Sequence, residues 1–539
     1  MNRWINFSLC LIAGVALFAA GWLMPIYLRA VDERVIQQAG QKSPGLVERG
    51  LVFIAAKNFG AAEMLFRAAE QENISGREKL RIAMQDSSQT LSNKSQPFTQ
   101  LIIQSDNREK TFKSLRASPN PVVQQLLRCR GLTNTVLFPP SQSSSGQAFD
   151  AALATSGLLF VGKLLTRGLT DAISTSSAVA LRGESSQALE QILLDVMSLG
   201  QRFNWGQLVA FCEKIEDAET LRLQANLARK ADAQLPVLFS AVQLSGKPAA
   251  VANYLMSFSE SGPKDLAASL HFGAGGVNEL LKRNQRLYRS SVQGKLNAVS
   301  GALVYLPWQM PKLALGLKWF LYLSAGYLIA LALHFARPRT PTAERPFQAR
   351  GFHVAREILF ALGFLLVVLL LSEPFLAQEN QQVEFPIRLQ LPTVSSAVAS
   401  ENTGAQGTIM NQLSLFTLLL FFVLQGLIYV GCLVKLAEIR RQRFSPGIKL
   451  KLLENEDNFF DAGLYLGFAG TIISLILVSV GVIKPSLMAA YSSTAFGVIF
   501  VSVFKIFHLR PLRRQLLLES ETEKELAALP VKNTAPTSL

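Results

Sequence analysis

Residues 461–510 read DAGLYLGFAGTIISLILVSVGVIKPSLMAAYSSTAFGVIFVSVFKIFHLR. Two apolar runs of about twenty residues flank the short segment GVIKPS, and each run is long enough to cross a hydrocarbon core of about 30 Å. The stretch therefore predicts a helical hairpin in a membrane. Small and hydroxyl side chains interrupt both runs: Gly467, Gly470, Thr471 and Ser474 in the first, and Ser492, Ser493, Thr494 and Gly497 in the second. Such residues either allow close helix packing or line a polar path, and the hairpin alone leaves both roles open.

Four further apolar runs predict membrane helices before the hairpin. They cover residues 7–28, 313–335, 358–371 (extendable to 376) and 413–434. With the hairpin, the prediction is an all-α polytopic membrane protein with about six spans. The first run is long for the hydrophobic region of a signal peptide, and Leu28, Arg29 and Ala30 make a poor cleavage site. We therefore expect an uncleaved anchor over residues 1–30, with a cleaved signal peptide as the alternative.

The basic residues follow the ends of these runs. The chain of 539 residues has a net charge of +15, and basic residues crowd segments 337–356, 435–451 and 505–514, whereas 378–412 holds only Arg388. The positive-inside rule places the basic segments and both chain ends in the cytoplasm, and places the loop 378–412 and the Lys484–Pro485 turn outside. In a bacterium this describes an inner-membrane protein whose residues 31–310 are periplasmic. Because the charge marks membrane boundaries, we do not expect nucleic-acid binding.

Residues 31–310 predict a helical domain of the solenoid or irregular-bundle type. Helices are expected over 187–199, 207–215, 218–231, 235–244, 248–258 and 276–288, without strand-like alternation. Residues 45–72 predict two short helices broken near Lys57; they resemble one tetratricopeptide-type (TPR-like) pair, with a plain helical hairpin as the alternative. Residues 149–169 predict a buried or amphipathic helix. The GAGG at 273–276 is expected to be a turn, because it lacks the spacing of a phosphate loop.

Enzymatic chemistry is not expected. The four cysteines (Cys10, Cys129, Cys212 and Cys432) and the scattered histidines show no metal-ligand spacing. The chain also lacks a nucleophile elbow, a phosphate loop and a pair of carboxylates at a plausible site. We therefore predict neither a metal nor a cofactor.

Residues 413–505 resemble the MotA/TolQ/ExbB proton-channel family. The order of elements is similar: one inward span, a cytoplasmic loop, and a hairpin out and back. LGFAGT at 466–471 is similar to the family's LGLLGT, and Pro485 with AYSSTAFGV at 490–498 is similar to its proline and ALxAT-x-GL. The chain departs from the pattern at Ala489 (usually glutamate), at Ser474 (usually glycine) and in its shorter cytoplasmic loop. The domain division is then 1–30, 31–310, a helix pair 311–377, an outer loop 378–412, a three-helix channel core 413–507 and a polar cytoplasmic tail 508–539.

The resemblance implies that Thr471, Ser493 and Thr494 line a pore. The glycines and the proline of the two motifs are expected to serve helix packing: Gly467, Gly470, Gly497 and Pro485. In the family, a ring of five channel subunits surrounds two single-span partner helices (ExbD/TolR-like), and the partner carries the proton-binding aspartate. No Asp or Glu lies in the middle of any span here; Glu373 and Asp461 lie at span ends. A partner would therefore have to supply the acid.

Two functions follow from these patterns. The first is an energising subunit that uses proton flow to drive an envelope process, either transport or force transmission. The second is a non-conducting membrane scaffold whose periplasmic helical domain binds other proteins. The loss of the family's glutamate at Ala489 favours the scaffold, and the two threonine motifs favour the channel.

Overall fold

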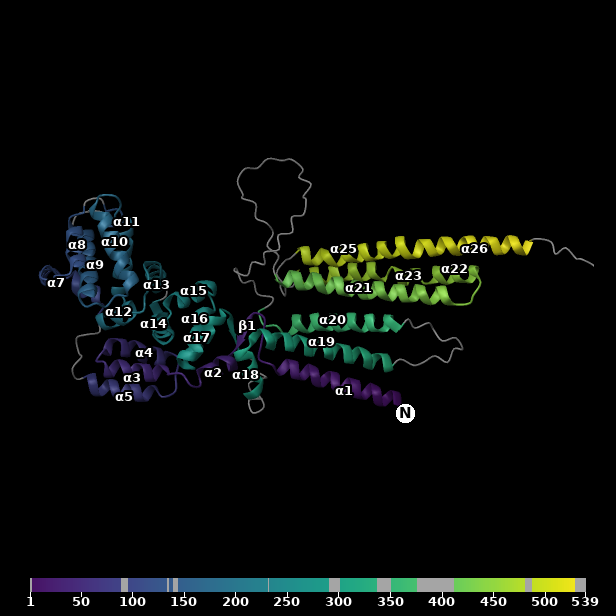
Figure 1. The fold of residues 1–539 in the computed structure, drawn as a ribbon, viewed down its shortest axis with the longest axis horizontal. Coiled ribbons are helices and arrows are strands. Elements are labelled where there is room, and N and C mark those ends of the chain that lie inside the picture. Colours follow the sequence, from purple (N-terminus) through teal and green to yellow (C-terminus); the bar gives the residue numbers. More distant parts are fainter. Residues whose placement is uncertain are drawn as a thin grey trace, which may run out of the picture. The chain divides into compact units, whose positions relative to one another are not determined.

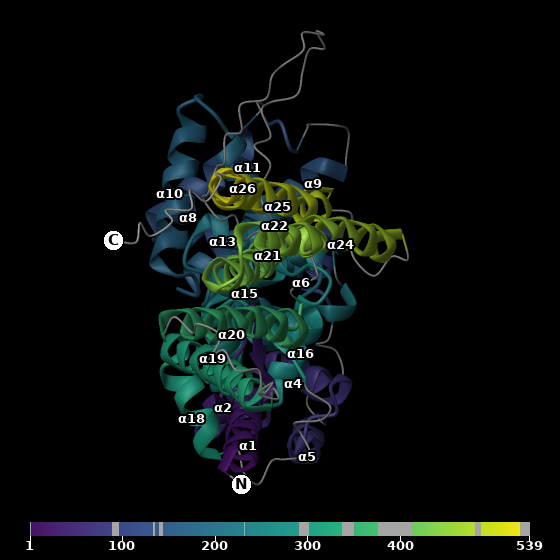
Figure 2. The ribbon, with the colours of Figure 1, turned by 90° about the vertical axis from the view of Figure 1, so that its right-hand side faces the viewer.

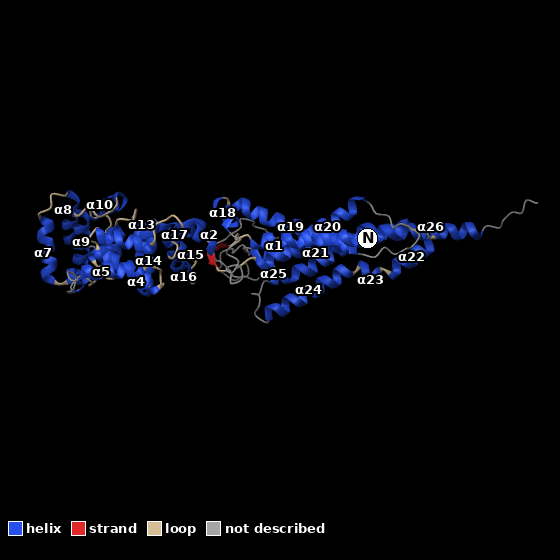
Figure 3. Ribbon diagram, turned by 90° about the horizontal axis from the view of Figure 1, so that it is seen from below, coloured by secondary structure: helices blue, strands red, loops and turns tan. Residues whose placement is uncertain are grey.

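The computed structural model describes residues 2–88, 96–132, 135–138, 144–230, 232–289, 301–336, 350–375, 412–479 and 487–528. Over these residues the fold is all-α as predicted, with a single pair of three-residue strands (Figure 3). The chain forms two compact units (Figure 1). We call Ala30–Gln309 the helical domain, and Met1–Arg29 with Met310–Leu539 the apolar-helix unit. Residues 378–411 of the outer loop, and Pro485, lie outside the described residues.

The helical domain is a succession of short helices. Its elements are β1 (Ala30–Asp32), α2 (Glu33–Gly40), α3 (Leu46–Ala55), α4 (Phe59–Gln71), α5 (Arg77–Ser88), α6 (Phe98–Ile103), α7 (Ser105–Arg116), α8 (Pro121–Arg128), α9 (Ser144–Val161), α10 (Arg167–Leu181), α11 (Gln187–Gly200), α12 (Trp205–Cys212), α13 (Ala218–Lys230), α14 (Leu235–Ser245), α15 (Pro248–Ser257), α16 (Gly262–Leu270), α17 (Gly273–Arg283), β2 (Arg286–Tyr288) and α18 (Gly301–Gln309).

The helix α14 is the centre of this domain. Its sequence LPVLFSAVQLS is apolar on nearly every side, and all of its residues are buried. A helix that is apolar all round must be covered by others. The helices α4, α12, α16 and α17 pack against it. The buried ring pair of Phe211 and Phe239, 5.9 Å between centroids, joins α12 to α14.

The helix boundaries follow local capping signals. Asn58 caps α4 by accepting a hydrogen bond from the Ala61 N–H, and its amide also donates to the Gly206 carbonyl at 2.9 Å. The break predicted near Lys57 is confirmed, because Lys57 adopts a left-handed φ of 59° between α3 and α4. The buried helix predicted over 149–169 is also present as α9, but it ends at Val161, and Thr166 caps the next helix.

Two boundaries near residue 280 differ from the prediction. The GAGG predicted as a turn forms the first turn of α17; only Gly273, with φ +66°, has turn geometry, and a Cβ there would lie 2.6 Å from the Pro44 carbonyl oxygen. The helix predicted over 276–288 ends at Arg283, because Asn284 is left-handed. Residues 286–288 instead form β2, which pairs in parallel with β1. Local periodicity could not reveal a partner strand about 250 residues earlier in the chain.

The apolar-helix unit contains α1 (Asn2–Leu23), α19 (Pro311–Ala336), α20 (Arg350–Ser372), α21 (Gln412–Arg441), α22 (Pro446–Asn455), α23 (Asp457–Phe460), α24 (Ala462–Ser479), α25 (Leu487–Phe504), a π-helical turn (Lys505–Leu509) and α26 (Arg510–Ala528). The helices α1, α19 and α20 pack side by side, α20 continues the contact to α21, and α25 packs on both α21 and α24 (Figures 1 and 2).

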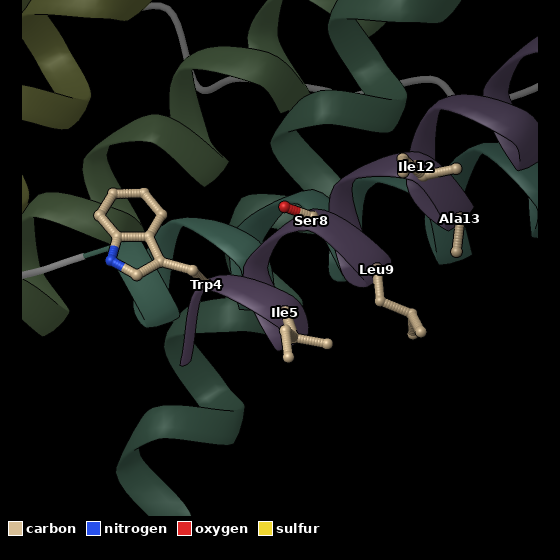
Figure 4. A pocket seen from close by; sticks show the side chains of 6 residues that line it. All are labelled: Trp4, Ile5, Ser8, Leu9, Ile12 and Ala13. Atoms are coloured by element: carbon tan, nitrogen blue, oxygen red, sulfur yellow. The ribbon is translucent and has the colours of Figure 1, made fainter. Parts of the chain in front are cut away.

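Among the described residues, four helical stretches are long and apolar enough to cross a membrane, which supports a membrane protein. They are Trp4–Leu23, Pro311–Ala336, Leu418–Arg441 and Tyr491–Glu523. The helices α20 and α24 are apolar over the shorter stretches Glu357–Leu369 and Ala462–Ile472. On α1, the side chains of Trp4, Ile5, Ser8, Leu9, Ile12 and Ala13 share one face (Figure 4). Most of these side chains are exposed and apolar, as on a helix that contacts lipid.

The segments after the fourth and sixth apolar runs contain helices. The helix α21 continues to Arg441, and α22 and α26 pack together. Leu453 of α22 is buried in a cluster with Leu512 and Leu516 of α26. The spacing of Leu509, Leu512 and Leu516 places them on one face of a helix, which explains why the polar tail is helical as far as Ala528.

Candidate functional site

The hydroxyl groups of the two sequence motifs meet between α24 and α25. The Oγ1 atoms of Thr471 and Thr494 lie 2.6 Å apart. The Gly467 carbonyl oxygen lies 3.2 Å from each of them and accepts a 2.9 Å hydrogen bond from Ser493 Oγ. Each hydroxyl has only one proton to donate. One threonine therefore donates to the other, and the second donates to the carbonyl. We call Thr471, Ser493 and Thr494 the hydroxyl cluster.

The hydroxyl cluster is buried in the helix contact. Thr471 and Ser493 are 7% and 1% exposed, and Thr494 is partly buried. The clustering was unknown from the sequence, which placed the three residues on two helices without their register. A threonine in an apolar helix often bonds its own backbone four residues earlier, and Thr471 makes this bond to Gly467. The bond between Thr471 and Thr494 joins the two helices in addition.

Three glycines lie where the backbones of α24 and α25 approach each other. A Cβ on Gly467 would lie 2.8 Å from the Ser493 carbonyl oxygen, and a Cβ on Gly497 would lie 2.7 Å from the Gly463 carbonyl oxygen. A Cβ on Gly470 would overlap Ser493 Oγ. Only hydrogen fits at these distances. The small residues therefore set how closely the hydroxyl cluster can assemble.

Gln425, on the third helix at this site, α21, was not among the residues predicted from the sequence. Its Nε2 donates to the Gly463 carbonyl at 2.9 Å, and its side chain is 1% exposed. Its Oε1 is also buried and accepts no hydrogen bond from the part of the chain that the structure describes. A lone amide within the apolar run LLLFFVLQGLIYV (418–430) was the available signal, because a buried polar group in a membrane helix needs a partner.

A small cavity opens beside Gln425. It offers about 10 Å³ to the centre of a water molecule. Its lining includes Gln425, Tyr429 and Cys432 of α21, Phe460 and Gly463 of the α23–α24 segment, and Phe500 and Phe504 of α25. Next to it, the Tyr429 hydroxyl lies 2.9 Å from Nε2 of His508 in the π-helical turn.

The acid at the start of the hairpin is paired with a base at its end. Lys505 Nζ lies 2.7 Å from Asp461 Oδ1 and 3.9 Å from Asp457 Oδ1. All three side chains are partly exposed. The pair closes the same end of the three-helix contact as His508, so charged and hydrogen-bonding groups concentrate there.

The other acid noted in the sequence, Glu373, has a different environment. Glu373 Oε2 accepts a 2.8 Å hydrogen bond from the Leu28 N–H. Lys318 of α19 is also buried; its Nζ donates to the Ile26 carbonyl at 2.6 Å and lies 4.2 Å from the centre of the Tyr27 ring. These two residues bind the backbone that follows α1. Glu373 thus serves a contact between α1, α19 and α20, and none of its recorded partners belongs to the hydroxyl cluster.

Among the described residues, no three His, Cys, Asp or Glu side chains gather as metal ligands would. The four cysteines are buried free thiols. What the site offers chemically is a set of neutral hydroxyl, amide and phenol groups within apolar helices, with charges at one end. Comparison of the chain with protein-family models, curated proteins and solved structures finds no match.

Proposed function

We propose that the chain is a proton-channel-like energising subunit that works with a single-span partner in the bacterial inner membrane. The observation that carries the proposal is the hydroxyl cluster: Thr471 and Thr494 are hydrogen-bonded to each other, from two apolar helices, at 2.6 Å. Hydroxyls can accept one proton and donate another, so they suit the wall of a proton path. Their positions are those at which the sequence resembles the MotA/TolQ/ExbB family.

In this proposal the partner supplies the proton-binding carboxylate. No Asp or Glu lies in the middle of any apolar run of the sequence, and the nearby Asp461 is paired with Lys505. A proton relay in a membrane needs a titratable group, and intramembrane acids are rare and usually functional. We therefore place the proton-binding aspartate on the partner's single span. A ring of five copies of this chain around the partner helices follows from the family resemblance.

The helical domain would transmit the effect of proton flow to a bound protein. With six spans and both chain ends in the cytoplasm, residues 31–310 would lie in the periplasm, as the positive-inside rule requires. Stacked short helices offer extended surfaces of the kind that bind other proteins. Proton flow through the core would then drive an envelope process through an unidentified protein bound there.

A non-conducting scaffold is the second candidate, and one observation favours it. Every hydroxyl of the cluster has a hydrogen-bond partner within this one chain. Satisfied hydroxyls can serve packing alone. In this case the helical domain would carry the function by binding proteins, and the apolar helices would only anchor it.

Replacement of both threonines separates the two candidates. Thr471→Val together with Thr494→Val removes the hydroxyls at nearly constant volume. We expect proton uptake by inverted membrane vesicles containing the chain and its partner to be abolished, with membrane levels unchanged. The partner can be sought as a neighbouring gene for a short protein with one span containing Asp.

The matched control is Thr471→Ser with Thr494→Ser, which keeps both hydroxyls and should retain most of the uptake. Full uptake in the double valine variant would eliminate the conducting function. Absence of uptake in the parent chain with its partner would favour the scaffold.

A further inference from the structure

Polar groups continue from the hydroxyl cluster towards the end of the hairpin that carries Asp461 and Lys505. The Gly467 carbonyl binds the hydroxyls, and the Gly463 carbonyl, one helical turn away, binds Gln425. Gln425, Tyr429 and Cys432 follow one another at helical spacing on one face of α21. Tyr429 then contacts His508. The interruption in this series is the cavity between Gln425 and Tyr429.

The amide oxygen of Gln425 marks this interruption. Both of its amide atoms are buried, yet only Nε2 has a partner among the described residues. A buried acceptor without a hydrogen bond destabilises the fold, so the site favours a small molecule that can donate to it. Because Gly463 has no Cβ, the space beside the Gln425 amide oxygen stays open. A Cβ at this position would lie 2.9 Å from Oε1 and would fill that space. Space and an unsatisfied acceptor therefore occur together.

The cavity has the size of one water molecule. Its space of about 10 Å³ for the centre of a water matches the smallest volume that holds one, and a bound water also needs at least two polar partners. Gln425 and Tyr429 both line it, and the Cys432 thiol is a weaker third group. The remaining wall is formed by apolar residues and Gly463, so the polar groups that can bind a guest are confined to the α21 side of the cavity.

We propose that this cavity is a water site, and that Gln425, the water, Tyr429 and His508 form a hydrogen-bonded path between the hydroxyl cluster and the Lys505 end of the core. The water donates to Gln425 Oε1 and reaches Tyr429. His508 lies in a π-helical turn, a distortion frequent at functional sites. The widened turn brings its ring to α21, within hydrogen-bond distance of Tyr429.

Use of this path for protons rests on the proposed channel function, whereas the water site itself does not. In transfer, one proton arrives at the water from the side of the hydroxyl cluster, and the water gives another of its protons to the Tyr429 oxygen, which releases its own proton to Nε2 of His508. Gln425 holds the water through Oε1 and carries no proton itself. The net change is one proton gained by His508 for one that entered at the water. His508 is then the last proton acceptor at this end of the path.

Cys432 is a native reporter for the water site. With Cys10, Cys129 and Cys212 replaced by alanine, it is the remaining thiol of the full-length chain. Silver ion replaces a thiol proton where water gives it access, and silver-blocked thiols are counted by labelling with a maleimide after denaturation. A chain that keeps only Cys10, which is buried on α1, provides the reference.

We expect Cys432 to react with Ag⁺ at least about tenfold faster than Cys10. In Gln425→Leu, the rate at which Cys432 reacts should fall about tenfold. Tyr429→Phe, which deletes only one oxygen, should slow the reaction in the same direction and covers the case that Gln425→Leu fails to fold. Gly426→Ala is the control, since a Cβ there meets nothing within 4 Å. Equal rates for Cys432 and Cys10, or a Cys432 rate unaffected by both variants, would overturn the water site.

Proton uptake by vesicles that contain the chain and its partner tests whether protons use this path. Tyr429→Phe should reduce uptake about tenfold without changing membrane levels. Fast Cys432 labelling without uptake in the parent chain would support the water site and reject the proposed function. Uptake that Tyr429→Phe leaves unchanged would show that protons take another route.

Discussion

Glu190 shows how a single residue can organise a segment far from any sequence motif. Its carboxylate is fully buried in the first turn of α11. It accepts hydrogen bonds from the N–H groups of Val136, Leu137 and Phe138 and a 2.5 Å hydrogen bond from the Ser186 hydroxyl. Burial alone would raise the pKa of Glu190, but these four donors hold it below its ordinary value of 4.5. The carboxylate thus fixes residues 136–138 to α11.

This arrangement predicts a loss of local stability in acid. Because the pKa of Glu190 is lower in the folded state than in the unfolded state, its contribution is complete above the unfolded value and is lost as the pH falls through the folded value. Glu190→Gln should remove about 1–3 kcal/mol at neutral pH, since one acceptor oxygen becomes a donor facing N–H groups. Hydrogen exchange of the amides of residues 136–138 in the full-length chain is the measurement.

We expect these amides to exchange faster in Glu190→Gln at neutral pH and in the parent chain below pH 4.5, after correction for intrinsic rates. Glu184, which is exposed on the preceding turn, gives the control Glu184→Gln. Unchanged protection in Glu190→Gln would contradict the role given to this carboxylate.

The candidate site could be predicted only in part at this scale. Thr471, Ser493 and Thr494 stand out because hydroxyls are conspicuous in apolar runs. Gln425 was just as conspicuous, but its role depends on Gly463, which is 38 residues away. His508 looked like an isolated histidine, because nothing local indicates that it meets Tyr429.

At the scale of elements, the contact between α24 and α25 depends on glycine. Small residues predict close helix packing, but they do not say which pairs of positions meet. The structure opposes Gly467 to Ser493 and Gly497 to Gly463. This register is what brings the two threonines to 2.6 Å.

Gly497→Ala is expected to separate the two helices. Its Cβ would lie 2.7 Å from the Gly463 carbonyl oxygen, a rigid backbone atom, so the helices must shift at a cost of about 1–3 kcal/mol. Thermal denaturation in detergent should show a lower midpoint. Gly426→Ala on α21 is the matched control, because its Cβ meets nothing and alanine favours a helix by about 1 kcal/mol. Equal or higher midpoints for Gly497→Ala would contradict the close contact.

The charged segments on either side of the hairpin contain the helices α22 and α26. Leucines of both helices share a core with Phe460 and Phe504. Charged residues of both signs are spread along these helices. The apolar face is visible only when residues are read at a spacing of three to four.

At the scale of the whole molecule, the helical domain begins and ends at one place. β1 begins after the six residues that follow α1, and β2 near the end of the domain pairs with it, Val31 opposite Leu287. Asp265 stabilises this closure by accepting hydrogen bonds from the Tyr254 hydroxyl and the Leu287 N–H. Such a domain can be inserted between two membrane helices without separating them.

The expected topology can be measured on the complete chain. A phosphatase that is active only in the periplasm, inserted in the exposed turn at residues 183–185, should be active. The same insertion at residues 442–445, in the exposed turn between α21 and α22, should be inactive. Activity with the reverse pattern would invert the orientation, and activity at neither site would reject a periplasmic helical domain.

The sequence by itself determined the all-α class and the apolar helices, because hydropathy and helical spacing are local properties of neighbouring residues. It also singled out Thr471 and Thr494 by their position in apolar runs. Only the tertiary structure decided that these hydroxyls share the Gly467 carbonyl, that Gln425 lies beside a water-sized cavity, and that β1 pairs with β2. The physical reason is that such contacts join residues far apart in the chain, and their register is set by the close packing of whole helices.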